Sequence, residues 1–268
     1  MTYRLVIVGG GRMGSALAEG LRNASWCAPE ELCVSVRRAE SIPALAERLE
    51  GVAISVGLPT EGVDASTGAV ICVKPDYAES VATQLAAAKF TRVLSVVAGL
   101  SCARLEAAFP GPVAVVRSMP NTPVLIGRGV TAIAGGSRVT SDDLAWAESI
   151  LSAVGTVVRV TERQIDAVTG LSGPMPAYLY LVIEALIEAG VHQGLAHDVS
   201  RQLVVDSFVG SALLLAETGL SPEELRAQVT SPGGTTAAGL RVLESRAVRS
   251  AFLETVAAAA ERSRQMGR

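Results

Sequence analysis

A glycine-rich segment near the N-terminus, VIVGGGRMGSALAEGL at residues 6–21, constrains the fold of this chain more than any other feature. It places a Gly-x-Gly-x-x-Gly motif directly after a β-branched apolar run and directly before an Ala- and Leu-rich stretch. In a strand–turn–helix unit these glycines permit a tight turn, close approach of the backbone to a pyrophosphate, and close packing of helix on strand. The motif therefore predicts dinucleotide binding, with the pyrophosphate at the helix N-terminus. We assign to this turn Gly9, Gly11, Arg12, Met13 and Gly14.

Residues 1–161 alternate short β-branched runs with Ala- and Leu-rich amphipathic stretches. This alternation is typical of a parallel sheet with crossover helices. The expected strands are 4–8, 32–36, 69–73, 92–97 and 113–116, with 129–134 and 156–160 extending the sheet around a helix at 141–154. Ser141 is the expected N-cap of that helix, because acidic residues follow it in the first turn.

The pattern changes at about Glu162, where strand signals end and long apolar helices begin. Ser221, followed by Pro222 and then by Glu224, forms a capping box at the start of one of them. The expected helices are 176–194, 196–218 and 221–229, with two more after a break that contains Pro and Gly. We therefore expect an α/β protein, with a Rossmann-like dinucleotide-binding domain at residues 1–161 and an all-α domain at residues 162–268.

The end of the second predicted strand indicates which dinucleotide binds. Proteins that bind NAD usually carry Asp or Glu there to hold the ribose hydroxyls. Here the segment CVSVRRAES, residues 33–41, has no carboxylate before Glu40. Ser35, Arg37 and Arg38 offer a hydroxyl and two guanidinium groups instead, which suit a 2′-phosphate. NADPH is therefore the expected cofactor, with NADH as the less favoured alternative.

Two further strand ends are expected to face the cofactor, because open α/β sheets bind ligands at the carboxyl ends of their strands. Val73, Lys74 and Pro75 end one strand and lead into a helix. Ala98 directly follows the next predicted strand. We therefore add these four residues to the cofactor site.

The composition argues against several classes of function. A net charge of −3 with 4% aromatic residues, and no basic stripe, disfavours nucleic-acid binding. Four scattered cysteines and two histidines support neither a metal site nor a disulfide framework, so a cytoplasmic location is expected. Hydrophobic residues reach 49%, but Glu184, Glu188 and Glu217 interrupt the longest apolar stretches, so no membrane span is expected. The apolar excess instead indicates helices buried against each other or against a second subunit.

One break in the helical half has two interpretations. The segment SPGGTT, residues 231–236, places a proline and two glycines between helices that otherwise follow one another closely. In the first interpretation the segment is an ordinary loop, because Pro and Gly commonly end one helix before the next begins. Alternatively, the backbone N–H groups from Gly233 to Thr236 head a helix and bind an anion.

The chain resembles pyrroline-5-carboxylate reductase in five motifs that occur in the same order: GxGxMG, VKP, MPNTP (119–123), LSG with PAY (171–178) and VTSPGGTTAAGL (229–240). The resemblance covers essentially the whole chain. It implies an enzyme that makes proline by NADPH-dependent reduction of a cyclic imine, and an all-α C-terminal dimerisation domain. It also implies a homodimer through the C-terminal helices, which in this family often assembles further into a decamer.

The resemblance also implies the residues of the substrate site. In this family the SPGGTT loop binds the carboxylate of the cyclic imine, which fits the positive end of a helix dipole. Thr236 is implied as the catalytic residue, because its hydroxyl would lie near the imine nitrogen and assist protonation. The substrate-binding residues implied in this way are Asn121, Glu162, Ser231, Gly233, Gly234, Thr235 and Thr236.

One segment departs from the family pattern. Relatives usually read Ser-Gly-Ser-Gly-Pro-Ala-Tyr, whereas residues 172–178 read Ser-Gly-Pro-Met-Pro-Ala-Tyr. Pro174 removes a hydroxyl and an N–H group, and Met175 makes the pocket wall bulkier if it faces the substrate. A reductase of another cyclic imine therefore stays open, as does a non-catalytic NADP-binding regulatory protein. A β-hydroxyacid dehydrogenase is disfavoured, because the helix at 176–194 has no lysine.

Overall fold

The computed structural model describes residues 2–266, which fall into two compact units. The first unit runs to Pro174 and also takes in the described part of the C-terminal segment from Ala257. The second unit is Met175–Val256. By its contacts the first unit therefore extends past the predicted boundary between residues 161 and 162.

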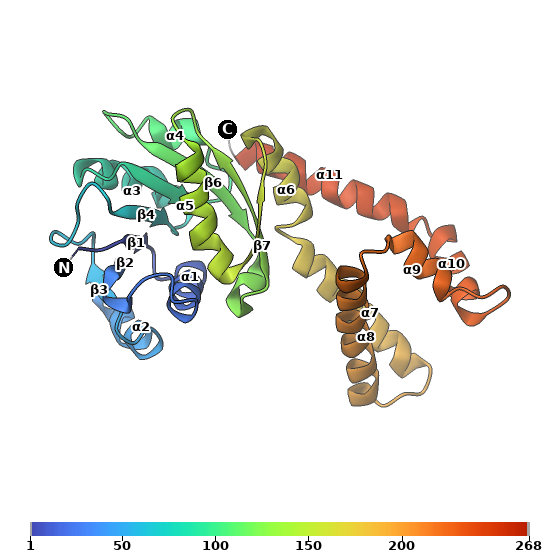
Figure 1. Ribbon diagram of the computed structural model, residues 1–268. Coiled ribbons are helices and arrows are strands. Elements are labelled where there is room, and N and C mark those ends of the chain that lie inside the picture. Colours follow the sequence, from blue (N-terminus) through green and yellow to red (C-terminus); the bar gives the residue numbers. More distant parts are fainter. Residues whose placement is uncertain (1, 267–268) are drawn as a thin grey trace. The chain divides into compact units, whose positions relative to one another are not determined.

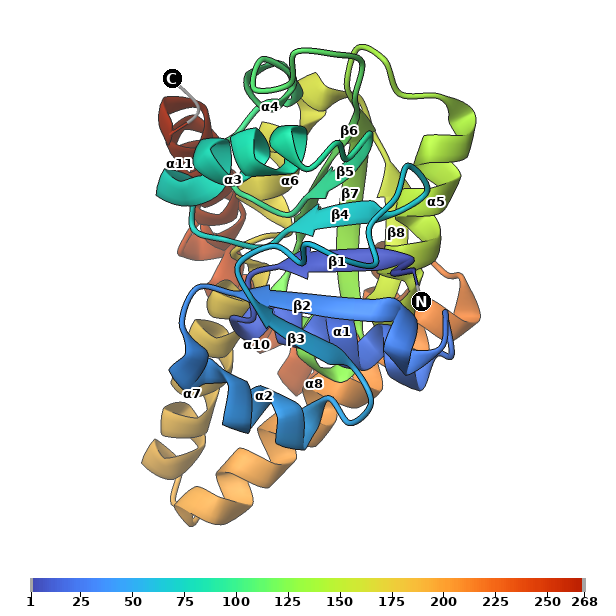
Figure 2. The ribbon, with the colours of Figure 1, turned by 90° about the vertical axis from the view of Figure 1, so that its left-hand side faces the viewer.

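The first unit is built on an eight-stranded sheet with the order β3-β2-β1-β4-β5-β6-β7-β8 (Figure 2). Neighbouring strands are parallel except for β6 and β7, which are antiparallel. The strands are β1 Leu5–Val8, β2 Leu32–Val36, β3 Ala53–Val56, β4 Gly68–Ile71, β5 Arg92–Ser95, β6 Ala114–Pro120, β7 Gly129–Gly135 and β8 Gly155–Arg159. The predicted parallel sheet and its two extensions are confirmed.

Two strands differ from the sequence prediction. β3 was not expected, because AISV is only four residues long and its side chains are half-buried or exposed at the edge of the sheet. β6 continues past the predicted end at residue 116, because its second half pairs with β7, up to the pair Pro120 and Thr131. The MPNTP segment therefore begins inside a strand.

Helices cover both faces of the sheet, which explains why every residue of β1 is buried. Successive side chains of a strand point to opposite faces. Leu5 and Ile7 accordingly belong to one apolar cluster, whereas Val6 and Val8 belong to another. The first cluster includes residues of α1 (Arg12–Asn23), α2 (Ile42–Arg48) and α5 (Ser141–Leu151), and the second includes residues of α3 (Pro75–Ala87) and α4 (Cys102–Glu106).

Residues just beyond the predicted domain boundary also pack on the sheet. Ile165, the first residue of α6 (Ile165–Leu171), is buried against Ala132 and Ala134 of β7. This packing is why the first unit extends to Pro174. Short 3-10 turns complete the unit: η1 Pro29–Glu31, η2 Ala39–Ser41, η3 Thr122–Ile126, η4 Ser152–Val154 and η5 Glu162–Gln164.

The N-cap of α5 is Thr140, so the prediction of Ser141 is wrong by one residue. The Thr140 hydroxyl accepts a hydrogen bond from the Asp143 N–H at 3.3 Å, and the Asp143 carboxylate accepts one from the Thr140 N–H at 2.9 Å. A capping box needs its acidic residue three positions after the cap, a spacing that Thr140 satisfies and Ser141 does not.

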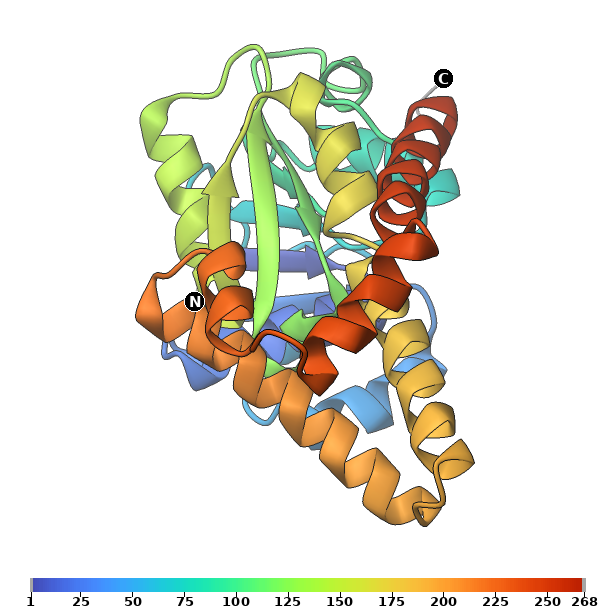
Figure 3. The same cartoon turned by 90° about the vertical axis from the view of Figure 1, so that its right-hand side faces the viewer.

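The second unit is entirely helical, as predicted (Figures 1 and 3). Its helices are α7 Met175–His192, α8 His197–Thr218, α9 Pro222–Gln228, α10 Thr235–Ser245 and the first part of α11, Val248–Met266. α7 and α8 pair as a hairpin, in which the Ser200 hydroxyl donates to the Ile187 carbonyl oxygen at 2.8 Å. The predicted capping box at Ser221 is confirmed, with hydrogen bonds in both directions to Glu224.

The α7–α8 hairpin leaves most of its apolar surface exposed within a single chain. Only Pro176 of α7 and Ser200 of α8 are buried. Two segments, Glu162–His192 and His197–Thr218, are long and apolar enough to cross a membrane by length and composition alone. The glutamates do not by themselves make these segments too polar or too short to span a membrane, and the expected absence of a membrane span stays a prediction.

Candidate active site

The glycine turn between β1 and α1 has the geometry that its motif predicts. Gly9 has a φ of +115°, and a Cβ there would clash with the carbonyl oxygen of Cys72. A Cβ on Gly14 would clash with the carbonyl oxygen of Gly9, so this glycine lets α1 approach the sheet closely. Beside Gly11, in contrast, the Cβ position has no atom within 4 Å from the described residues other than its neighbours along the chain. The backbone at the N-cap of α1 is therefore open to a ligand.

A cleft of about 700 Å³ opens beside this turn, at the carboxyl ends of β1, β2 and β4. The strand order reverses at β1, and doubly wound sheets bind ligands at such a switch point. Of the predicted cofactor residues, the lining of the cleft includes Gly9, Gly11, Ser35, Arg37, Arg38, Val73 and Lys74. Those outside the lining are Arg12, Met13, Gly14, Pro75 and Ala98.

Sequence reasoning missed the side of the cleft that β3 and α3 form. Its residues are Val56 and Gly57 at the end of β3, and Tyr77, Ser80, Val81 and Gln84 on α3. The end of β3 could not be assigned because the strand itself was not predicted. Tyr77 did carry a signal, because it lies in the first turn of the helix that Lys74 begins.

The charge of the cleft is positive. Among the described residues that line it, three are cationic (Arg37, Arg38 and Lys74) and none is acidic. Ser35 is buried at the end of β2, whereas both arginines are exposed. The N-terminus of α1, which has no acidic residue in its first turn, adds a further positive end. The arrangement suits an anionic ligand with more than one phosphate group.

The one thiol in the lining of this cleft does not change that charge. Cys72 follows β4 and lines the cleft. Desolvation raises the pKa of its thiol to about 12, so the group stays neutral at physiological pH. The field in the cleft therefore comes from the cations and from the helix N-terminus.

The predicted substrate loop lies in the second unit. Gly233 has a φ of +70°, and Gly234 is the N-cap of α10 without a side chain to cap it. The Gly234 N–H donates to the Ser231 carbonyl oxygen at 3.1 Å. Contrary to the sequence reading, it is therefore not among the free donors in this structure. Helix geometry leaves the N–H groups of Thr235 and Thr236 without acceptors inside α10, and their predicted role in binding an anion stays a prediction.

Asn121 has a structural partner in the first unit. It is buried at the end of β6, and its side-chain oxygen accepts a hydrogen bond from the Val130 N–H at 2.9 Å. This bond holds the start of η3 against β7. Its predicted role toward the substrate stays a prediction.

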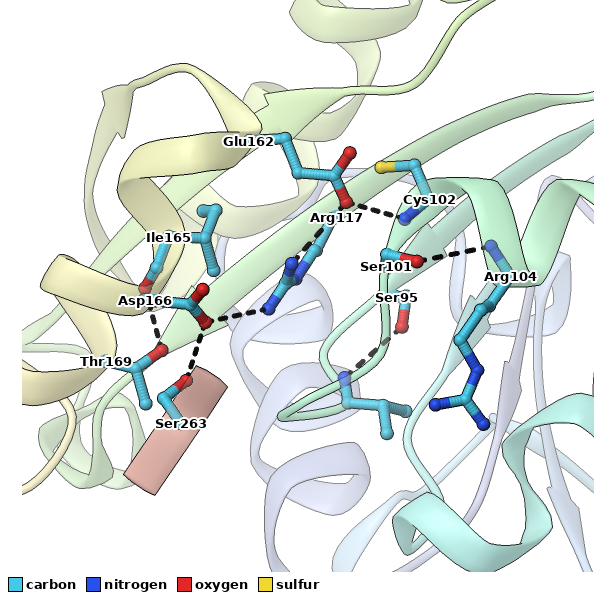
Figure 4. A network of polar contacts seen from close by, with 11 residues as sticks. Ser95, Ser101, Cys102, Arg104, Arg117, Glu162, Ile165, Asp166, Thr169 and Ser263 are labelled. Atoms are coloured by element: carbon cyan, nitrogen blue, oxygen red, sulfur yellow. Dashed lines mark hydrogen bonds and ion pairs between the residues drawn. The ribbon is translucent and has the colours of Figure 1, made fainter. Parts of the chain in front are cut away.

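Glu162 takes part in a polar network around Arg117 of β6 (Figure 4). Its carboxylate accepts a hydrogen bond from the Cys102 N–H at 2.6 Å and lies 3.4 Å from a guanidinium nitrogen of Arg117. Arg117 also lies 3.8 Å from Asp166, whose carboxylate accepts a hydrogen bond from Ser263 at 2.8 Å. Glu162 is therefore held by residues of the first unit, and its role toward the substrate stays a prediction.

Sequence reasoning missed Arg117, since it lies in a mostly apolar strand and outside the MPNTP motif that begins at residue 119. Its side chain is only 8% exposed and faces two carboxylates. Burial and the neighbouring Glu162 raise the pKa of the Cys102 thiol to about 12, so this thiol adds no charge to the network.

Comparison with known proteins finds a matching family for each half of the chain. The family described as "NADP oxidoreductase coenzyme F420-dependent" matches residues 4–99, and the pyrroline-5-carboxylate reductase dimerisation family matches residues 162–266. The chain is 41% identical to the pyrroline-5-carboxylate reductase of Synechocystis over 100% of both chains. It is 39% identical to that of Corynebacterium melassecola over 98% of each.

Solved structures agree with the sequence comparison. The pyrroline-5-carboxylate reductase of Coxiella burnetii superposes with a TM-score of 0.92 at 32% identity, covering 100% of both chains. The Plasmodium falciparum enzyme, solved with NADP bound, gives a TM-score of 0.84 at 31% identity and covers 99% of this chain and 98% of its own. Members of one family therefore match this chain over both of its halves. The chain belongs to the pyrroline-5-carboxylate reductase family.

Proposed function

We propose that this protein reduces the C=N bond of 1-pyrroline-5-carboxylate to L-proline with hydride from NADPH. The observation that carries the proposal is similarity over the full length to proteins of that name, at 39–41% identity. The structure supports it with a positive cleft in the first unit and an uncapped helix N-terminus in the second. The comparisons do not favour another cyclic imine or a regulatory role.

The residues of the cleft fit a nicotinamide dinucleotide phosphate. The open backbone at Gly11 and the N-terminus of α1 would hold the pyrophosphate, and Ser35, Arg37 and Arg38 would hold the 2′-phosphate. When bound, the reduced cofactor supplies the hydride. The absence of a carboxylate from the lining favours NADPH over NADH, because nothing there would repel a 2′-phosphate.

The SPGGTT loop would orient the imine. The N–H groups of Thr235 and Thr236 point along a helix dipole that favours the substrate carboxylate. The Thr236 hydroxyl would donate a hydrogen bond to the imine nitrogen, which makes the adjacent carbon a better hydride acceptor. Addition of a hydride to that carbon and of a proton to the nitrogen would give the amine of proline. The remaining contribution of the protein is positioning.

An assay of NADPH and NADH oxidation tests the proposed function. With 1-pyrroline-5-carboxylate, we expect NADPH to give the higher kcat/KM, because the cations in the cleft match its additional phosphate. Turnover of the six-membered homologue shows whether Pro174 and Met175 change the ring size that the enzyme accepts. Absence of turnover with either cofactor on the five-membered imine would overturn the proposal.

The proposed enzyme is a homodimer through its C-terminal helices. The dimerisation family matches residues 162–266, the region whose apolar helices lie exposed in one chain. A second copy of the hairpin would cover this surface and account for its apolar character without a membrane, which agrees with a cytoplasmic enzyme. Larger assemblies up to the decamer would be built from such dimers.

Light scattering at micromolar concentration is expected to give at least twice the chain mass of 27.6 kDa. Leu213 on α8 is 51% exposed, and Leu213→Glu should lower the mass toward that of the monomer, because a buried charge at an interface is costly. Val158→Glu places the same charge on β8 of the first unit, where the residue is 47% exposed, and serves as the control. A monomeric mass for the unmodified protein would rule out the dimer.

A further inference from the structure

We propose that Tyr77 is a specificity-determining residue that holds Arg37 in position for the 2′-phosphate of NADPH. The inference rests on the proposed function of the cleft and extends it to a residue on the opposite wall. It assigns to the aromatic ring a role in choosing between NADP(H) and NAD(H). The ring does this through Arg37 and need not touch the phosphate.

Tyr77 and Arg37 come from different elements and meet at the cleft. Tyr77 lies in the first turn of α3, where its N–H donates to the Lys74 carbonyl oxygen at 3.0 Å. Arg37 directly follows β2. Its guanidinium carbon lies 5.0 Å from the centre of the Tyr77 ring, and both residues line the cleft. The contact therefore joins the β2 end of the cleft to the α3 wall.

A ring contact of this kind leaves the hydrogen-bonding capacity of Arg37 free. The N–H groups of a guanidinium lie in its plane, whereas an aromatic face attracts its positive charge through the quadrupole. Within residues 2–266 the Arg37 side chain forms neither an ion pair nor a hydrogen bond with another residue. Its planar set of donors is therefore oriented by the ring and available to a phosphate.

The other two arginine–aromatic pairs of the described residues differ in this respect. Arg4 lies 4.2 Å from the Trp26 ring centre and also donates to the Trp26 carbonyl oxygen. Arg92 lies over Trp146 and pairs with the Asp143 carboxylate at 2.8 Å. Both guanidinium groups are already engaged within the chain. Of these three arginines, Arg37 is the one that lines the cleft and whose N–H groups have no hydrogen-bond partner within the described residues.

Holding Arg37 in place should strengthen binding of the phosphorylated cofactor selectively. An exposed arginine loses side-chain freedom when it binds a phosphate, and that loss weakens binding. A side chain already restrained by a ring loses less. NAD(H) has no 2′-phosphate, so it gains nothing from the restraint. The ring therefore affects the ratio of the two affinities.

Calorimetric titration of the full-length protein with NADP⁺ and with NAD⁺ tests the inference without any imine substrate. Tyr77→Leu removes the ring and keeps an apolar side chain. We expect it to weaken NADP⁺ binding about two- to tenfold, the range that ordering one long side chain on binding costs, and to leave NAD⁺ binding unchanged. Tyr77→Phe keeps the ring and should bind both cofactors as the unmodified protein does.

A double-mutant cycle separates an effect through Arg37 from a direct one. In an Arg37→Ala background, Tyr77→Leu should no longer change NADP⁺ affinity, because the restrained group is gone. Arg4→Ala disrupts the arginine–aromatic pair outside the cleft and should leave both affinities unchanged. Thermal melting without cofactor should be the same for Tyr77→Leu and the unmodified protein, since Tyr77 is 47% exposed.

Three outcomes would overturn the inference. Equal weakening of NADP⁺ and NAD⁺ by Tyr77→Leu would show that the ring contacts a part common to both cofactors. Full additivity in the cycle would show that the ring acts independently of Arg37, and unchanged NADP⁺ binding would show no role. Tight NADP⁺ binding without imine reduction would instead refute the proposed reaction and leave the inference intact.

Discussion

Replacement of Thr236 by valine is expected to lower kcat by about 10²-fold, the loss typical when a proton donor is removed from a transition state. Valine keeps the size of the side chain and deletes the hydroxyl. Thr236 is half-buried in the first turn of α10, next to the N–H groups proposed to bind the substrate carboxylate. The carboxylate site remains in the variant, so the loss should appear mainly in kcat and not in KM.

Steady-state kinetics with 1-pyrroline-5-carboxylate measure this split. Thr235 is the matched control, because it is the neighbouring threonine of the same turn and is exposed. Thr235→Val retains the backbone N–H that is proposed to bind the anion, so its kcat should stay close to that of the unmodified protein. A tenfold rise in KM at unchanged kcat for Thr236→Val would mark Thr236 as a binding residue only.

The second large effect concerns stability. Arg117→Met is expected to lower the free energy of unfolding by about 2–3 kcal/mol, since removing one partner leaves two carboxylates beside an apolar side chain. The figure is below that for a fully buried pair, because Glu162 and Asp166 remain 32% and 26% exposed to solvent. For a chain of this size the change corresponds to a fall in Tm of about 5–10 °C.

Differential scanning calorimetry checks this expectation. Arg104→Met is the control, because Arg104 forms an ion pair with Glu79 at 2.8 Å in which both side chains are about half exposed. Exposed pairs contribute about 0–1 kcal/mol, so the control should change Tm little. Adding Glu162→Gln to Arg117→Met should restore part of the loss, because one uncompensated charge disappears. Equal Tm values for the two arginine variants would refute a role for the network.

Much of the fold could be predicted from the sequence because the decisive signals are local. The glycine turn needs only its own residues, since the strained φ of Gly9 and the close packing at Gly14 follow from a strand–turn–helix unit. The capping box from Ser221 to Glu224 spans one helical turn. The change from β-branched alternation to long apolar helices after residue 161 likewise marked two different architectures.

The same local reasoning placed several of the predicted cofactor residues at one cleft. Ser35 lies near the end of β2 and Arg37 and Arg38 follow that strand, and all three line the cleft. It failed where two adjacent residues could both cap a helix. The N-cap of α5 is Thr140, one residue before the expected Ser141. It also failed at Gly234, whose N–H closes a turn on Ser231. A motif specifies a turn but does not specify which of its donors the turn itself uses.

Contacts between distant segments were decided only by the tertiary structure. Arg117 meets Glu162, and Asp166 meets Ser263 across 97 positions, because the sheet order and the return of α11 bring these segments together. Tyr77 meets Arg37 because β2 and α3 both border the cleft. Periodicity and motifs indicate the local structure of one helix, strand or turn. Pairs of distant residues depend instead on which strands become neighbours in the sheet. The sequence by itself therefore determined the two architectures and the phosphate-binding turn, and only the packing of the sheet decided which charged and aromatic side chains meet.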